Sequence, residues 1–254
     1  ISREARKVIK ISSKNKKNLI KVNYNNLSFF KNILKKNEID FVIFFLGKNL
    51  KKKSKKKSFY INYQLPLKIL KYLISLSDSK IRVIFFGTFL ENEKNSSKEN
   101  LDYKKNKIAL RQKIINLNKK RNFEFVWLKL PIIYGYKNIG SSFINNLIKK
   151  IKTGKKIKID YKYNTVNLLH VNDLNKVLKK IKLNWKVYRN QVVYSDSEGP
   201  FFIFEFLEKI KQKLKFKNII SFQNKKKRKK LNIKNKIIKI NLKNNSLNFI
   251  KKYV

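Results

Sequence analysis

Short, continuously apolar runs alternate along the chain with segments whose apolar residues recur at helical spacing. Four runs have the length of strands: 41–46 (FVIFFL), 81–86 (IRVIFF), 123–130 (FEFVWLKL) and the weaker 191–194 (QVVY). Such runs are typical of strands that are buried on both faces, as the strands of parallel sheets are. We therefore predict a sheet that is buried inside the protein.

Helical periodicity fills most of the intervals between these runs. Apolar residues recur three and four positions apart in 27–36, 65–76, 104–117, 143–151, 174–181 and 201–214. Alternation of helix and buried strand predicts an α/β fold, with a parallel sheet, flanking helices and right-handed crossovers. In sheets of this kind, ligands bind at the carboxyl ends of the strands.

Composition narrows the class of protein. The 254 residues, 42% of them hydrophobic, suffice for one large domain or a domain with a small lobe. The chain contains no apolar run of membrane-spanning length and opens on no signal-peptide pattern, so we expect a cytoplasmic protein without a membrane partner. The absence of Cys excludes disulfides and zinc–thiolate sites, and the single histidine, His170, is expected to be structural.

The charge is extreme, with 64 Lys and Arg against 15 acidic residues and a net charge of +49. One interpretation is selection for a polyanionic partner. The other is mutational bias in an A/T-rich genome, which the even spread of lysine and the abundance of Asn, Ile, Phe and Tyr favour. Non-specific nucleic-acid binding is expected in either case. The basic clusters 48–57 and 225–230 are interpreted as solvated loops in preference to specific sites.

Three side chains between two of the predicted elements suggest acid/base chemistry. Thr88 closes the strand that begins at Ile81, and Tyr103 and Lys107 open the next helix, one turn apart on the same face. A phenol has a pKa of about 10, which a nearby cation lowers. The Thr88 hydroxyl would hold the substrate oxygen that exchanges a proton with Tyr103, which suits hydride transfer to or from a nicotinamide.

The spacing Tyr-x-x-x-Lys is weak evidence alone, because chance produces it in a chain so rich in lysine. Only Tyr103 among the twelve tyrosines has Lys four positions later. Its place just after a strand that ends in a hydroxyl carries more weight than the spacing does.

Six segments resemble, in the same order, those of extended short-chain dehydrogenases/reductases of the NAD-dependent nucleotide-sugar epimerase/dehydratase type. They are 41–47 (FVIFFLG), 61–73 (INYQLPLKILKYL), 87–89 (GTF), 128–135 (LKLPIIYG), 167–174 (NLLHVNDL) and 194–210 (YSDSEGPFFIFEFLEKI). GTF resembles the CDP-abequose-synthase-like branch, which has Thr in place of the usual Ser. The resemblance implies a Rossmann-like cofactor domain over 1–135 and a mostly substrate-binding lobe over 136–254, with strand segments that return to the sheet.

The resemblance also implies functional residues, NAD or NADP as cofactor, a nucleotide-sugar substrate and a homodimer formed through the Tyr103 helix. The catalytic residues would be Thr88, Tyr103, Lys107 and Asn62. The residues that bind the cofactor would be Arg3, Asn23, Gly47, Lys107 and Tyr134. The residues that hold the substrate diphosphate would be Arg228 and Lys229. Among these, Arg3 stands where an Arg often meets the 2′-phosphate of NADP, and Asn23 stands where an Asp normally meets the adenine.

The chain departs from the family pattern in ways that leave two functions open. None of its six glycines forms the family's G-x-x-G-x-x-G loop, so we expect the family's first strand and first helix to be missing from these residues, and Lys129 replaces an Arg. Glu91 and Glu93 lack the spacing of the acidic pair of a 4,6-dehydratase, which favours an epimerase or a reductase. The alternative is a non-catalytic or degenerate protein of this fold that binds RNA or serves as a structural subunit.

Overall fold

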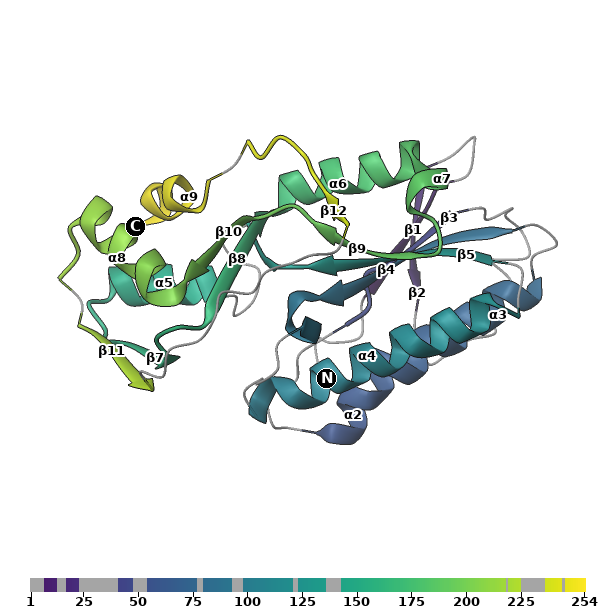
Figure 1. The fold of residues 1–254 in the computed structure, drawn as a ribbon, viewed down its shortest axis with the longest axis horizontal. Coiled ribbons are helices and arrows are strands. Elements are labelled where there is room, and N and C mark those ends of the chain that lie inside the picture. The colour runs from purple at the N-terminus through teal and green to yellow at the C-terminus, as the bar shows by residue number, and fades with distance from the viewer. Residues whose placement is uncertain are drawn as a thin grey trace.

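A computed structural model shows a large α/β lobe beside a smaller mixed lobe (Figure 1). It describes residues 7–12, 17–22, 41–47, 54–76, 80–92, 98–120, 123–135, 143–217, 219–224, 236–243 and 245–254. Several predictions fall outside these ranges: helix 27–36, the cluster 225–230, and the roles of Arg3, Asn23, Arg228 and Lys229.

Five parallel strands form the main sheet of the large lobe, in the order β12-β9-β5-β4-β3. They are β3 (Phe41–Phe44), β4 (Ile81–Thr88), β5 (Phe123–Leu130), β9 (Gln191–Ser195) and β12 (Ile237–Ile238). All four predicted strands are therefore confirmed, and so are the α/β class and the Rossmann-like parallel sheet. The central strands β4 and β5 are almost entirely buried, which explains their unbroken apolar sequences.

Helices cover both faces of this sheet (Figure 1). One face carries α2 (Lys55–Phe59), the π-helical turn η1 (Tyr60–Gln64), α3 (Leu65–Leu76) and α4 (Lys98–Asn118); the other carries α6 (Val171–Leu183) and α7 (Trp185–Tyr188). Each face has its own apolar core. Leu70, Leu110 and Trp127 are buried on the α3–α4 side, and Val126 and Val177 on the α6 side.

The start of α4 and the presence of α2 differ from the sequence-based expectation. Helix α4 begins at Lys98, so Tyr103 lies inside the helix and not at its start as predicted. The opening residues of α4 are mostly polar and carry no apolar periodicity that could reveal them. The predicted basic loop 48–57 is partly wrong, because Ser54 accepts a hydrogen bond from the Lys57 N–H at 3.1 Å and so caps helix α2.

In the described part of the chain, the smaller lobe consists of two short sheets and three helices. The strands β6 (Ile132–Tyr134), β8 (Thr165–His170) and β10 (Glu198–Phe202) form one sheet, and β7 (Ile157–Tyr161) pairs with β11 (Ile220–Asn224) in another. The helices are α5 (Phe143–Lys152), α8 (Ile203–Leu214) and α9 (Ser246–Tyr253). Ile144, Leu168, Phe206 and Ile250 are buried in the core between them.

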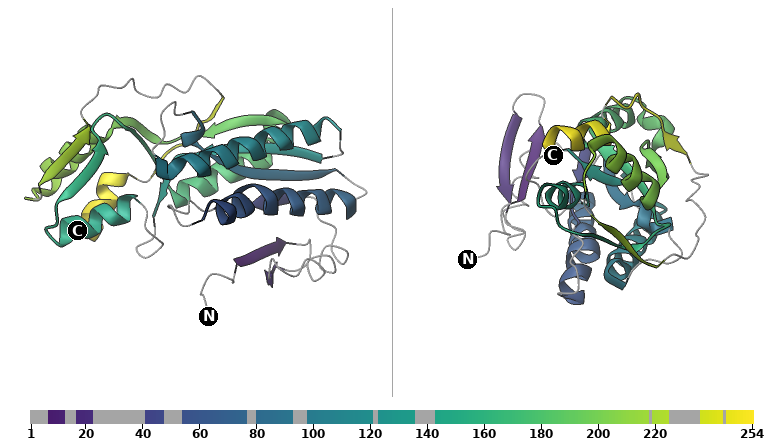
Figure 2. Two further views of the ribbon diagram at one scale, coloured as in Figure 1. Left: turned by 90° about the horizontal axis from the view of Figure 1, so that it is seen from below. Right: turned by 90° about the vertical axis from the view of Figure 1, so that its left-hand side faces the viewer.

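A hairpin that the sequence analysis did not predict lies apart from the main sheet in both views of Figure 2. It consists of β1 (Lys7–Ser12) and β2 (Lys17–Val22), which pair antiparallel with Lys7 opposite Val22. Within the part of the chain that the structure describes, no helix is both long and apolar enough to cross a membrane.

Candidate active site at the carboxyl end of the sheet

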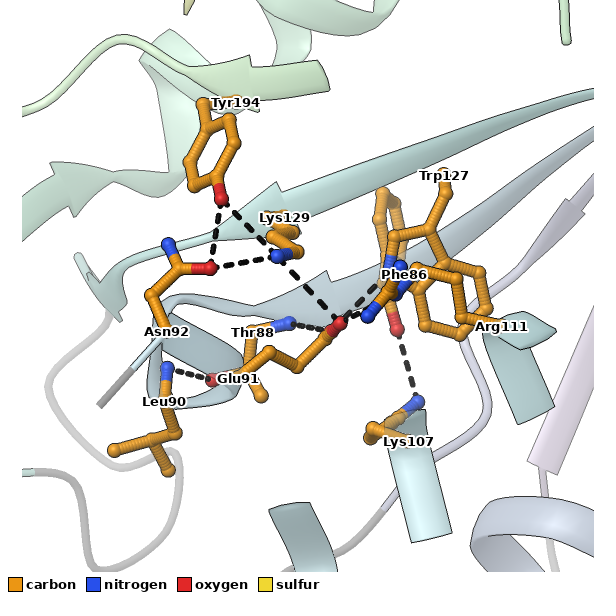
Figure 3. A network of polar contacts seen from close by, with 10 residues as sticks. All are labelled: Phe86, Thr88, Leu90, Glu91, Asn92, Lys107, Arg111, Trp127, Lys129 and Tyr194. Carbon is orange, nitrogen blue, oxygen red and sulfur yellow. Dashed lines mark hydrogen bonds and ion pairs between the residues drawn. The ribbon is translucent and has the colours of Figure 1, made fainter. Parts of the chain in front are cut away.

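Thr88 is the last residue of β4, at the carboxyl edge of the main sheet, as predicted. A 3-10 turn, η2 (Phe89–Asn92), follows it and folds back on it. The Thr88 N–H donates to Glu91 Oε1 at 3.0 Å, and Thr88 Oγ1 accepts from the Leu90 N–H at 3.3 Å (Figure 3). The turn therefore fixes both the backbone and the hydroxyl of Thr88.

Lys107 ties helix α4 to the same edge of the sheet. Its Nζ donates to the carbonyl oxygen of Leu46 at 3.1 Å and to that of Phe86 at 2.9 Å, at the ends of β3 and β4. The side chain is buried, with 2% of the residue exposed. The same Nζ lies 5.9 Å from the centroid of the Tyr103 ring, so the two residues share one face of α4.

Gly47 and Asn62 lie against this lysine. Gly47 follows β3 with φ +150, a backbone conformation that favours glycine. A Cβ at Gly47 would lie 2.9 Å from Lys107 Nζ and 3.4 Å from Asn62 Oδ1. The structure therefore brings Gly47, Asn62 and Lys107 together, and a side chain at position 47 would displace the buried Lys107 ammonium.

Asn62 is fully buried in the π-helical turn η1. Its Nδ2 donates to the Ser58 carbonyl oxygen at 2.9 Å and to Ser58 Oγ at 3.3 Å. Asn106 of α4 donates to the same Ser58 Oγ at 3.3 Å, which joins α2 to the helix that carries Tyr103. Single π-helical turns inside helices are frequent at functional sites. Asn62 therefore lies inside a continuous helical segment, between α2 and α3.

Burial controls the protonation of the Tyr103–Lys107 pair. Burial, followed by the negative charge of Glu91, raises the pKa of Tyr103 to about 12. Burial also lowers the pKa of Lys107 to about 8, and Glu91 opposes that change. The expected lowering of the Tyr103 pKa is therefore not seen in this structure, where the hydrogen bonds of Lys107 go to two carbonyl groups. At neutral pH the phenol is protonated and is a proton donor.

Glu91 is at the centre of a buried polar network that the sequence analysis set aside. Besides the Thr88 N–H, its carboxylate accepts from Trp127 Nε1 at 3.1 Å and from Arg111 Nε at 2.9 Å (Figure 3). Lys129 Nζ is 3.7 Å from Glu91 Oε2. The available signal was scarcity, because Glu91, three positions after the end of β4, is one of 15 acidic residues in a chain with 64 basic ones.

Lys129, which stands where the family has an Arg, extends this network towards β9. Its Nζ donates to Asn92 Oδ1 at 2.7 Å and lies 3.0 Å from Tyr194 Oη. Tyr194 Oη also donates to Asn92 Oδ1, at 2.8 Å. Lys129 therefore connects η2 with β5 and β9, and the substitution keeps a buried cation beside Glu91.

Tyr134 belongs to a different cluster, in the smaller lobe. Its hydroxyl donates to Glu198 Oε1 at 2.5 Å, and its ring packs edge-on against His170 and Phe249. Burial and the Glu198 carboxylate raise the pKa of Tyr134 far above its usual range. His170 Nδ1 accepts from the Asn172 N–H at 3.2 Å, so His170 caps α6, which is a structural role as expected.

A cavity of about 480 Å³ opens beside Thr88, between the main sheet and the smaller lobe. Its volume lies in the range of small-molecule sites, about 300–1,000 Å³. The lining residues come from the ends of β4 and β5, from α4 and α5, and from β6, β7 and β8; they include Thr88, Asn100, Pro131, Asn146, Lys150, Lys158 and Asn167. Asn100 precedes Tyr103 by three positions and so shares its helix face.

The parallel sheet, with helices on both faces and the candidate site at its carboxyl edge, defines a Rossmann-like α/β fold. The chain belongs to the NAD dependent epimerase/dehydratase family, whose model matches residues 2–189. No curated protein matches the sequence.

Solved structures share this fold at low sequence identity. Pal from Bacillus thuringiensis matches with a TM-score of 0.63 and 12% identity, over 80% of this chain and 68% of that chain. UDP-glucose 4-epimerase from Thermotoga maritima matches with a TM-score of 0.60 and 12% identity, over 80% of this chain and 70% of that chain. ADP-L-glycero-D-manno-heptose-6-epimerase from Helicobacter pylori matches with a TM-score of 0.62 and 16% identity, over 92% of this chain and 77% of that chain. Similarity at this level describes the fold and not the activity.

Proposed function

We propose that the protein is an NAD(P)-dependent enzyme that acts on a nucleotide-activated sugar by hydride transfer, with Tyr103 as the acid/base group. One observation carries the proposal: a buried Lys107 holds the Tyr103 face of α4 against the carboxyl edge of the sheet, where Thr88 lines a cavity. A protein that only binds RNA or another subunit has no need of this arrangement.

Each side chain has a distinct role in this mechanism. The Thr88 hydroxyl holds the sugar oxygen at the reacting carbon. Tyr103 donates its proton to that oxygen when a carbonyl is reduced, since its pKa of about 12 keeps it protonated at neutral pH. The buried Lys107 fixes the helix and supplies positive charge near the ring, which favours the phenolate when the reaction runs in reverse.

The described residues fit one half of the cofactor. Gly47 has no side chain, and it borders the buried Lys107 ammonium and Asn62 at the edge where dinucleotides bind. Lys107 and Gly47 would hold the ribose and nicotinamide. When bound, the nicotinamide supplies or accepts the hydride. Arg3 and Asn23, which would contact the adenosine half by resemblance, lie outside the described residues.

The environment of Glu91 bears on the type of reaction. A 4,6-dehydratase requires an acidic group that reaches the sugar, whereas Glu91 is 9% exposed and accepts hydrogen bonds from Thr88, Trp127 and Arg111. We therefore place the activity with the epimerases or reductases.

Turnover of nucleotide sugars by wild-type protein and by Tyr103→Phe tests the proposal. We expect saturable NAD(P)H binding in both proteins and a loss of turnover of about 10²- to 10⁴-fold in the variant. Thr88→Val, which removes only the hydroxyl, should also lower turnover. Tyr163→Phe is the matched control, because Tyr163 packs against Phe202 and Phe204 away from this edge of the sheet. Equal turnover of wild type and Tyr103→Phe would contradict the mechanism.

A further inference from the structure

Glu91 occupies a position prepared for a carboxylate. Its four polar contacts come from three different elements: the Thr88 N–H of β4, the Trp127 indole and Lys129 of β5, and Arg111 of α4. Buried carboxylates persist where such hydrogen bonds and opposite charges compensate the loss of water.

Gly87 shows that the backbone accommodates this carboxylate. A Cβ at position 87 would lie 2.5 Å from Glu91 Oε1 and 2.2 Å from Trp127 Nε1, closer than side-chain atoms can approach. Glycine at the penultimate position of β4 therefore allows Glu91 and the indole to pack against the strand. The G-T-F-L-E sequence from Gly87 to Glu91 forms one structural unit.

The carboxylate also acts on the two titratable groups of α4. Glu91 raises the pKa of both Tyr103 and Lys107, so its charge favours the protonated form of each. The charged groups that face Glu91 are Arg111 and Lys107 on α4 and Lys129 on β5, with the Tyr194 hydroxyl beyond Lys129. Glu91 is the acidic group among these cations.

We propose that Glu91 is a positioning residue, which fixes the Thr88 end of β4 and places a buried negative charge beside the Tyr103 and Lys107 face of α4. It would act on the reaction through Thr88 and Tyr103 without contacting substrate. This inference rests on the proposed function for its effect on turnover, although its effects on Thr88 and Tyr103 can be measured without any substrate.

Glu91→Gln tests this proposal, because glutamine keeps the shape and removes the charge. Tyrosine NMR with label at Cζ, assigned with Tyr103→Phe, follows the ionisation of Tyr103, and amide exchange follows the Thr88 N–H. We expect the Tyr103 pKa to fall below the wild-type value, Thr88 exchange to accelerate, and kcat to fall about 10- to 100-fold. A pKa change would not follow from loss of packing alone.

Glu124→Gln is the matched control. Glu124 accepts from the Trp185 indole at 2.6 Å and from Arg189 at 2.7 Å, so it has the same kinds of partners at the opposite end of β5. This variant should leave the Tyr103 pKa, Thr88 exchange and kcat at wild-type values. A folded Glu91→Gln protein with unchanged Tyr103 ionisation and unchanged Thr88 exchange overturns the proposal.

A second variant keeps the test decisive if Glu91→Gln does not fold. Glu91→Asp retains the charge and withdraws it from Thr88, so Thr88 exchange should accelerate while the Tyr103 pKa stays close to the wild-type value. Exchange at the wild-type rate in this variant also overturns the proposal. If the NMR results hold and wild-type protein turns over no nucleotide sugar, the proposed function fails and the role of Glu91 stands.

Discussion

The Nζ of Lys107 lies 2.9 Å from the carbonyl oxygen of Phe86, so a buried ammonium on α4 is bonded directly to the backbone of the central strand β4. Its second bond, to the carbonyl oxygen of Leu46, reaches the segment that directly follows the neighbouring strand β3. Helix and sheet are therefore held together at the candidate site by a charged group whose burial has an energetic cost.

That cost predicts an unusual dependence of stability on pH. The pKa of Lys107 is lowered from 10.5 to about 8, so between these values the unfolded chain binds the proton and the native protein does not. The free energy of unfolding contributed by Lys107 therefore rises with pH across this window. The difference in unfolding free energy between wild type and Lys107→Met should move by about 2 kcal/mol in favour of wild type between about pH 7.5 and about pH 9.5.

Urea denaturation at the two pH values measures this change. Lys180→Met is the control, because Lys180 is exposed and donates to the Lys239 carbonyl oxygen on the surface. The difference in unfolding free energy between Lys180→Met and wild type should stay constant with pH. A constant difference for Lys107→Met as well would mean that Lys107 is not a buried cation.

Gly87→Ala should disrupt the site through steric contact alone. The added Cβ would meet the Trp127 indole at 2.2 Å, so we expect a loss of about 2–3 kcal/mol in unfolding free energy and a changed Trp127 fluorescence. Gly154→Ala is the comparison, because position 154 has φ +63 and open space around it. This variant should lose about 1 kcal/mol of unfolding free energy through backbone strain and leave the Trp127 fluorescence unchanged. Equal losses in both variants would contradict this assignment.

Tyr134→Phe separates a structural role for Tyr134 from the cofactor contact that the family resemblance implies. The Tyr134 hydroxyl donates to Glu198, and Glu198 accepts from the Ser246 N–H at 2.9 Å and from Ser246 Oγ at 2.7 Å at the start of α9. Removal of the hydroxyl should accelerate amide exchange in α9 and cost about 1 kcal/mol, with NAD(P)H affinity unchanged. Weaker NAD(P)H binding with unchanged exchange would support the cofactor contact instead.

The net charge of +49 predicts electrostatic binding of nucleic acid that carries no sequence information. The logarithm of the affinity for RNA should fall linearly with the logarithm of salt concentration, by about 10³-fold or more between about 50 and about 200 mM salt. Fluorescence anisotropy with two unrelated RNA sequences measures this, and both should bind equally. Affinity that is insensitive to salt, or that prefers one sequence, would favour the RNA-binding alternative.

The main sheet and its helices could be predicted because burial on both faces leaves an unbroken apolar signal, as at 123–130. The hairpin β1–β2 and the start of α4 could not be predicted in this way, since lysines interrupt the apolar pattern there. In the site, the shared face of Tyr103 and Lys107 follows from helix geometry. The position of Glu91 depends on contacts with Trp127 and Arg111 that no local pattern contains.

Several predictions remain predictions after the structure. They are the homodimer, the domain boundary at 135, and the functional roles of all the predicted site residues. Four of these residues, Arg3, Asn23, Arg228 and Lys229, also lie outside the described part of the chain.

The last described segments of the chain contribute to both lobes. Ile238 of β12 is fully buried in the core on the α6 side of the sheet, and Ile250 of α9 is fully buried in the core of the smaller lobe. During synthesis, neither core can be completed before these residues leave the ribosome. The preceding part of this basic chain therefore leaves the ribosome, which is rich in RNA, while both cores are still incomplete. Non-specific binding to RNA then competes with folding during translation.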